Sequence, residues 1–117
     1  MSSERAALVA AVVAVLDDTE REYAQMPFFV RPMVRRGLAK RTGRDLAEWR
    51  AALTGLGARP APELVAPLAD LAEHYRGAPE RARRGMGARP DELRAIEERS
   101  AARAAAVLAL RAALLAG

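Results

Sequence analysis

A run of basic side chains in the first half of the chain is the strongest chemical feature of this sequence. No carboxylate occurs between residues 31 and 44, and Asp45 is the first acid after the run. Six cations lie within it: Arg31, Arg35, Arg36, Lys40, Arg41 and Arg44. Guanidinium groups bind carboxylates and phosphates through paired hydrogen bonds, so the run predicts a basic face that contacts an acidic partner. A solvated helix face is the alternative interpretation.

Two aromatic residues precede the basic run. Phe28 and Phe29 stand between Pro27 and Pro32, and an apolar pair placed between prolines is typical of a plug that anchors a turn in the core. We therefore expect both phenylalanines to be buried. Stacking on nucleic-acid bases is the alternative, and it would use the basic run together with a second cluster at Arg81, Arg83 and Arg84.

The other reactive residue types are scarce. The chain has no cysteine, which excludes disulfides and thiolate ligands, and His74 is its one histidine. We expect His74 and Glu73 to belong to a solvated helix face. Nucleophilic catalysis needs a nucleophile beside a base with a third group to orient it, and no such set is present. The sequence therefore predicts a protein that is not an enzyme and holds neither a metal nor a cofactor.

Composition sets the frame for these residues. The chain has 117 residues, of which 51% are hydrophobic and 4% aromatic, and its net charge is +4. This length predicts one helical domain over residues 1–117, with a thin core in which alanine is common. The apolar run from Ala6 to Leu16 would rise only about 16 Å as a helix, too little to span a bilayer. We expect a cytoplasmic protein.

Apolar spacing and stop signals predict an all-α compact bundle of about five helices. The first should run from Ser3 to about Gln25, with its apolar half buried and its charged half in solvent. Pro27 ends it, and a turn to Arg31 leads into a second helix that begins at Pro32 and ends before Gly43. Residues at spacing four form the expected core side of this second helix: Val30, Val34 and Leu38.

The remaining helices follow from the same signals. Asp45 and Glu48 form a capping box that begins the third helix. Its expected core positions are Leu46, Trp49, Leu53 and Leu56. A fourth helix should run from about Pro62 to Arg76, followed by a basic loop over residues 77–90. Its core stripe is Leu64, Leu68, Leu71 and Tyr75.

The last helix should begin at Pro90 and be the longest. Its apolar stripe is Leu93, Ile96, Val107, Leu110 and Leu114. Ser100 and Arg103 interrupt the stripe, so we expect this helix either to cross a polar seam or to project beyond the body. Self-association into a homo-oligomer through this helix is a further expectation.

The segment Met26–Arg36 resembles a known family. Its Pro-Phe-Phe-Val-Arg turn followed by Val34-Arg35-Arg36 is similar to the small C-terminal helical domain found in light-independent protochlorophyllide reductase and in stand-alone proteins like it. The similarity continues weakly to Leu53, and Pro32 departs from the cation usual at its position. The resemblance implies a helical module that docks on a larger protein or helps to enclose a tetrapyrrole-type ligand. Four residues are candidate ligand or core contacts: Phe28, Phe29, Met33 and Trp49.

Three functional hypotheses thus come from the sequence. The first is an interaction module that presents Arg31–Arg44 to a larger acidic protein. The second is a nucleic-acid-binding protein that uses the same arginines. The third is the accessory role in tetrapyrrole binding that the family resemblance implies.

Overall fold

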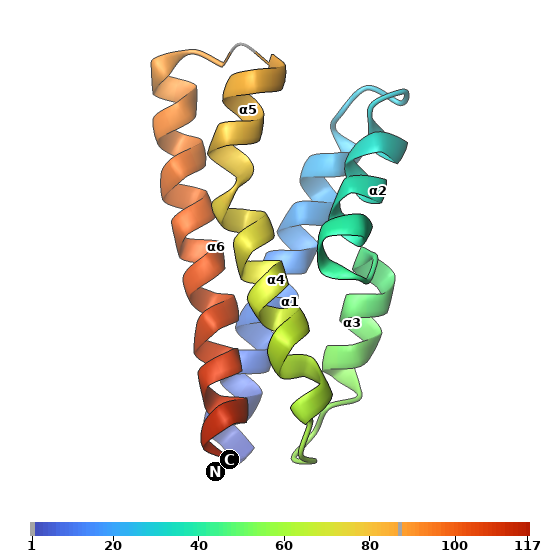
Figure 1. Cartoon of the computed structure of the whole chain (residues 1–117), viewed down its shortest axis with the longest axis vertical. Coiled ribbons are helices and arrows are strands. Elements are labelled where there is room, and N and C mark those ends of the chain that lie inside the picture. Colours follow the sequence, from blue (N-terminus) through green and yellow to red (C-terminus); the bar gives the residue numbers. More distant parts are fainter. Residues whose placement is uncertain (1, 87) are drawn as a thin grey trace.

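The computed structural model describes residues 2–86 and 88–117, and within them it is all-α, as predicted. Six α-helices and one short 3-10 turn make up this part of the chain. Their bounds are α1 Ser2–Ala24, α2 Arg31–Thr42, α3 Leu46–Thr54, η1 Pro62–Leu64, α4 Val65–Arg76, α5 Ala78–Met86 and α6 Pro90–Ala116. The body measures 44 × 25 × 20 Å, and both ends of the chain lie at the same end of the long axis (Figure 1).

Helix α6 is the long element against which α4, α1 and α5 pack. It lies along α4 and α5, which follow one another up the same side, while α1 packs against α6, α3 and α2 (Figure 1). The turn between α1 and α2 and the junction between α5 and α6 lie at the end of the molecule opposite to the termini (Figure 1). The prediction of a long C-terminal helix is confirmed.

The stripes predicted for α3 and α4 form part of the core, together with residues of α1, α2 and α6. Every predicted position in these two stripes is buried, and Trp49, Leu64, Leu68 and Leu71 are completely enclosed. The capping box at Asp45 is present, since its side chain accepts from the Glu48 backbone N–H at 2.8 Å while Glu48 accepts from the Asp45 N–H at 2.9 Å. Gly43 ends α2 in the left-handed conformation, with φ of 82°. These local signals are therefore reliable in this chain.

Helix α1 differs from the prediction. We expected its apolar first half to be buried all round, but only one stripe is buried and it continues into the charged half. The buried residues are Val12, Val15, Leu16, Thr19 and Tyr23. The alanines of the first half are largely exposed: Ala6, Ala7, Ala10, Ala11 and Ala14. The reason is position, because α1 lies at the outside of the body and a helix there can bury one face only.

The segment 77–90 is the second correction. We expected a loop, but Ala78–Met86 forms α5. Pro79 lies in the first turn of this helix, where its missing N–H removes no helical hydrogen bond. Glu80 then accepts from Arg83 at 2.6 Å and from Arg84 at 3.2 Å, which adds ion pairs along the exposed side. The additional helix, α5, therefore forms in a segment whose glycines and proline are typical of a loop.

The polar interruption of α6 is a seam across the body, not a projecting end. Ser100 is buried, and Arg103 donates two hydrogen bonds to Glu22 of α1, at 3.0 and 2.5 Å. Arg99 contributes a second contact with Glu22 at 3.3 Å. The two long helices are thus joined by ionic contacts between Glu22 and the arginines at positions 99 and 103.

Candidate protein-interaction surface on helix α2

A tight turn connects α1 to the basic run on α2. The Pro27 carbonyl accepts from the Val30 N–H at 2.9 Å and from the Arg31 N–H at 3.3 Å, and Val30 in turn caps the first turn of α2. The helix begins at Arg31, one residue before the expected Pro32. Proline at the second position of a helix costs no hydrogen bond, because the first four N–H groups have no partner within the helix.

The phenylalanines lie outside the core, so the expected plug is wrong. Phe28 is 79% exposed, Phe29 is 68% exposed and Met33 is 63% exposed. The two rings meet edge to face, with centroids 5.7 Å apart. Helical geometry explains the exposure of Met33: Val34 and Leu38 turn one side of α2 inward, and Met33 is rotated by about 100° from Val34, while Phe28 and Phe29 lie in the turn that precedes the helix.

The six cations of the run do not form one uniform face. Arg35 approaches Glu20 at 3.6 Å, the one carboxylate contact among the six within the described chain. Arg31 donates through Nε to the Met26 carbonyl at 2.9 Å, and Arg44 lies over the Trp49 ring at 5.1 Å. Arg41 turns toward α4 and donates to His74 Nδ1 at 3.2 Å.

Arg36 and Lys40 are exposed cations of α2. They follow Met33 at helical spacing, so an exposed apolar residue precedes two exposed cations along the helix. Neither has a carboxylate within 4.0 Å among residues 2–86 and 88–117. We call the set Phe28, Phe29, Met33, Arg36 and Lys40 the α2 surface.

The nearest acids of α1 are already engaged by other helices. Arg50 of α3 donates to Asp17 at 2.7 Å and to Glu20 at 3.1 Å, and Glu22 faces the arginines of α6. The hydrogen bonds that Arg50 donates to Asp17 and Glu20 raise the pKa of Arg50 above its ordinary value. Glu20 is thus shared between Arg50 of α3 and Arg35 of α2, while Asp17 and Glu22 pair with arginines of other helices.

Trp49 does not share a site with the phenylalanines. It is completely buried, and its indole N–H donates to Thr42 Oγ1 at 2.9 Å. A ligand pocket lined by Phe28, Phe29, Met33 and Trp49 would need all four side chains at one wall. The structure brings Phe28, Phe29 and Met33 to the surface and places Trp49 in the core.

His74 departs furthest from its predicted surroundings. We expected it on a solvated face, yet it is 4% exposed. Burial, followed by Arg81 and Arg41, lowers the pKa of His74 to about 3, so its ring is neutral near pH 7. Arg81 of α5 donates to the His74 carbonyl at 2.6 Å. The sequence carried no sign of this cluster, because Arg41 and Arg81 lie 33 and seven residues away from His74.

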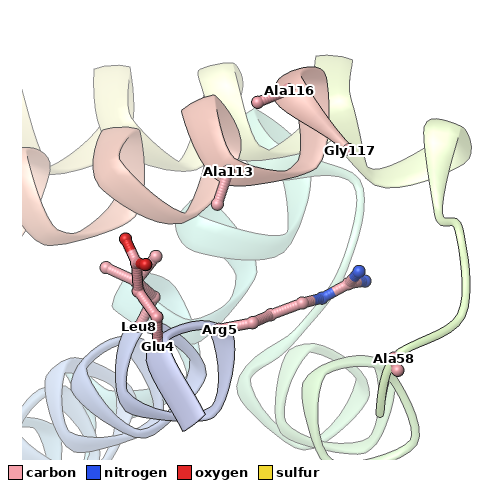
Figure 2. A pocket seen from close by; sticks show the side chains of 7 residues that line it. All are labelled: Glu4, Arg5, Leu8, Ala58, Ala113, Ala116 and Gly117. Atoms are coloured by element: carbon pink, nitrogen blue, oxygen red, sulfur yellow. The ribbon is translucent and has the colours of Figure 1, made fainter. Parts of the chain in front are cut away.

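Other kinds of site find less support. Within the described residues, no three side chains of the metal-binding types lie close enough to hold an ion, and no helix is long and apolar enough to cross a membrane. A hollow lies where α1, the segment at Ala58 and the end of α6 meet, and Arg5 extends through it toward Ala58 (Figure 2). Arg5 donates to the Arg59 carbonyl at 2.6 Å, and Glu4 is the other charged residue of the lining beside Leu8, alanines and a glycine.

The chain was compared with models of protein families, with curated proteins and with solved structures, and none of these comparisons gave a match. The resemblance of Met26–Arg36 to the reductase domain therefore stays a prediction.

Proposed function

We propose that this protein is a non-enzymatic helical interaction module, and that the α2 surface binds an acidic segment of a larger protein. One observation carries the proposal: three large apolar side chains stand exposed beside cations that no carboxylate of the described chain neutralises. Phe28, Phe29 and Met33 supply the apolar part. A helix or strand of the partner that carries both apolar and acidic side chains would match both parts.

Energetics favour a protein partner for the apolar part. Burying one exposed phenylalanine or methionine side chain contributes about 1.5–3 kcal/mol. Aromatic and arginine side chains also dominate the energy of protein interfaces. The cations add steering toward an acidic surface and determine the orientation of the partner. Arg31 and Arg44 lie at the margin of this surface, where they have contacts within the chain but no carboxylate within 4.0 Å among the described residues.

Nucleic acid is the rival partner, and the exposed phenylalanine pair beside cations favours it, because bases stack on aromatic rings. The two partners differ in salt dependence. Affinity for single strands falls with salt at a slope of about −0.7 for each phosphate neutralised, so six cations would give a slope of about −4. Arg36 and Lys40 alone would give only about −1.4, which makes phosphates a weak source of affinity for this surface.

A peptide-binding experiment tests the proposal. The probes are a labelled amphipathic peptide of leucine and glutamate and its analogue with lysine in place of glutamate, and binding is followed by fluorescence anisotropy. We expect the acidic peptide to bind and the basic one not to bind. A Phe28→Ser/Phe29→Ser variant should raise the dissociation constant about tenfold or more for each ring lost. An Arg36→Glu/Lys40→Glu variant should mainly slow association.

Matched controls separate the surface from general effects. Leu115 is another exposed large apolar residue, 61% exposed, and Arg94 is an exposed arginine of α6. Leu115→Ser and Arg94→Glu should leave binding of the acidic peptide unchanged. Equal losses in these controls would refute the proposal. So would tighter binding to an oligothymidine with a salt slope near −4, or to vesicles that contain phosphatidylserine.

A further inference from the structure

Two arginines from different helices meet at one buried histidine. Arg41 of α2 donates from Nε to His74 Nδ1 at 3.2 Å, and Arg81 of α5 donates from Nη2 to the His74 backbone carbonyl at 2.6 Å. Their Nη groups are not all used by these bonds, since each guanidinium has five donors in a planar fork. Each arginine therefore keeps donors that His74 does not use.

Each guanidinium is held against a glycine close by in its own sequence. A Cβ at Gly37 would lie 2.8 Å from Nη2 of Arg41, and a Cβ at Gly77 would lie 2.8 Å from Nη1 of Arg81. In both cases the glycine is four residues before the arginine, so the side chain folds back along the helix. Because Gly37 and Gly77 have no side chains, the guanidiniums of Arg41 and Arg81 can occupy the space beside them.

No negative charge compensates this pair within the described residues. Neither Arg41 nor Arg81 has a carboxylate within 4.0 Å in that part of the chain, and burial, followed by the charges of Arg81 and Arg41, lowers the pKa of His74 so that its ring is neutral near pH 7. Burial, followed by the nearby Arg41 charge, lowers the pKa of Arg81. Like charges repel strongly where water is partly excluded, so this arrangement stores an electrostatic cost that an anion would remove.

The Tyr23 hydroxyl is a neutral donor on α1, which packs against α2. Tyr23 of α1 is 7% exposed, and its hydroxyl forms no hydrogen bond with any other described residue. Burial raises the pKa of the Tyr23 hydroxyl, while Arg81 and Arg41 act in the opposite direction. Helix α2 packs against α4, and α4 leads into α5, so these three helices contribute the two arginines and His74 (Figure 1).

We infer that Arg41 and Arg81 form a binding site for a phosphate group beside the buried His74. Two guanidiniums supply the two positive charges that match a phosphate dianion, and arginine forks pair with its oxygens. Arg41 is exposed as a residue, so the site is open to solvent and a ligand can reach it without any movement of the bundle. This site lies beside the α2 surface and is independent of the proposed function, because Arg41 points toward α4 and not outward with Arg36 and Lys40.

Binding of inorganic phosphate to the full chain tests this inference. Melting is measured in phosphate and in chloride at equal ionic strength, and the dissociation constant is measured by calorimetry. At phosphate ten times above the dissociation constant, the unfolding equilibrium constant should fall about elevenfold relative to chloride. Arg81→Met should abolish this effect, and it keeps the apolar stem. Arg84→Met is the matched control on the same helix, since Arg84 is exposed and pairs with Glu80 at 3.2 Å; it should respond to phosphate as the original chain does.

A second variant keeps the test decisive if Arg81→Met does not fold. Arg41→Met removes the other guanidinium and should raise the phosphate dissociation constant at least tenfold, while binding of the acidic peptide changes far less. Equal melting in phosphate and chloride would overturn the inference, as would an undiminished phosphate response in both Arg81→Met and Arg41→Met. A response to acetate as strong as that to phosphate at equal ionic strength would overturn the assignment of a dianion.

Discussion

The substitution Thr42→Val should destabilise the fold through a hydrogen bond that no water can replace. Trp49 is completely buried and its indole N–H donates to Thr42 Oγ1 at 2.9 Å, while that hydroxyl donates to the Leu38 carbonyl at 2.9 Å. Valine keeps the volume of threonine but offers no acceptor. Leaving a buried donor unpaired costs about 1–3 kcal/mol, and we expect the free energy of unfolding to fall by that amount. The melting temperature should drop by about 4–15 °C.

Urea denaturation followed by far-ultraviolet circular dichroism measures this loss, and Thr54→Val is the matched control. The Thr54 hydroxyl bonds only to backbone carbonyls of its own helix and the residue is exposed, so its loss should cost less than about 0.5 kcal/mol. In a Trp49→Phe background, which has no indole N–H, the additional cost of Thr42→Val should shrink by about 1 kcal/mol. Equal costs in the two backgrounds would refute this account of the Thr42–Trp49 bond.

Three further predictions concern the polar contacts. Unfolded His74 takes up a proton below its ordinary pKa of 6.5, whereas the folded pKa is about 3. The original chain should therefore lose about 2–3 kcal/mol of stability between pH 7 and 4.5 relative to His74→Gln; parallel pH–stability curves would contradict this. Glu22→Gln should lower the free energy of unfolding, measured by urea denaturation, by about 1–3 kcal/mol. This value lies between those for exposed and buried ion pairs, because the Arg103 side chain is 12% and the Glu22 side chain 37% exposed. A change below about 0.3 kcal/mol would show that the Glu22–Arg103 pair does not stabilise the fold. Gly37→Ala should raise stability by about 0.5–1 kcal/mol through helix propensity and yet weaken phosphate binding, since its Cβ displaces the Arg41 guanidinium; calorimetry showing unchanged phosphate affinity would count against that displacement.

Local signals in the sequence were sufficient for most of the fold. The end of α2 at Gly43, the capping box at Asp45 and the core position of Trp49 depend on interactions within a few residues, and all three are confirmed. The prediction of a loop over residues 77–90 was wrong because it relied on local signals alone. Gly77 and Pro79 are local signals for a loop, but packing of α5 on α6 outweighs them.

The candidate sites depend on contacts that no local pattern contains. Phe28 and Phe29 have the composition of a core plug, and only the direction of α2 relative to the body decides that they face solvent. The single histidine has no partner nearby in sequence except Glu73, so its burial beside Arg41 and Arg81 required the packing of α2, α4 and α5. Sequence reasoning could identify these residue types but not which of them meet.

The basic run also shows why a cluster of cations in sequence is not one patch in space. Successive residues of a helix are rotated by about 100°, so Arg36 and Lys40, four apart, share a side, while Arg41 is turned about 100° from Lys40. That rotation divides the run between the outward α2 surface and the inward contact with His74. Charge reversal at Arg36 and Lys40 should consequently weaken peptide binding with little change in phosphate affinity, and Arg81→Met should do the opposite. If both variants weakened both activities equally, the two surfaces would have to be one site, and the division of the run would be wrong.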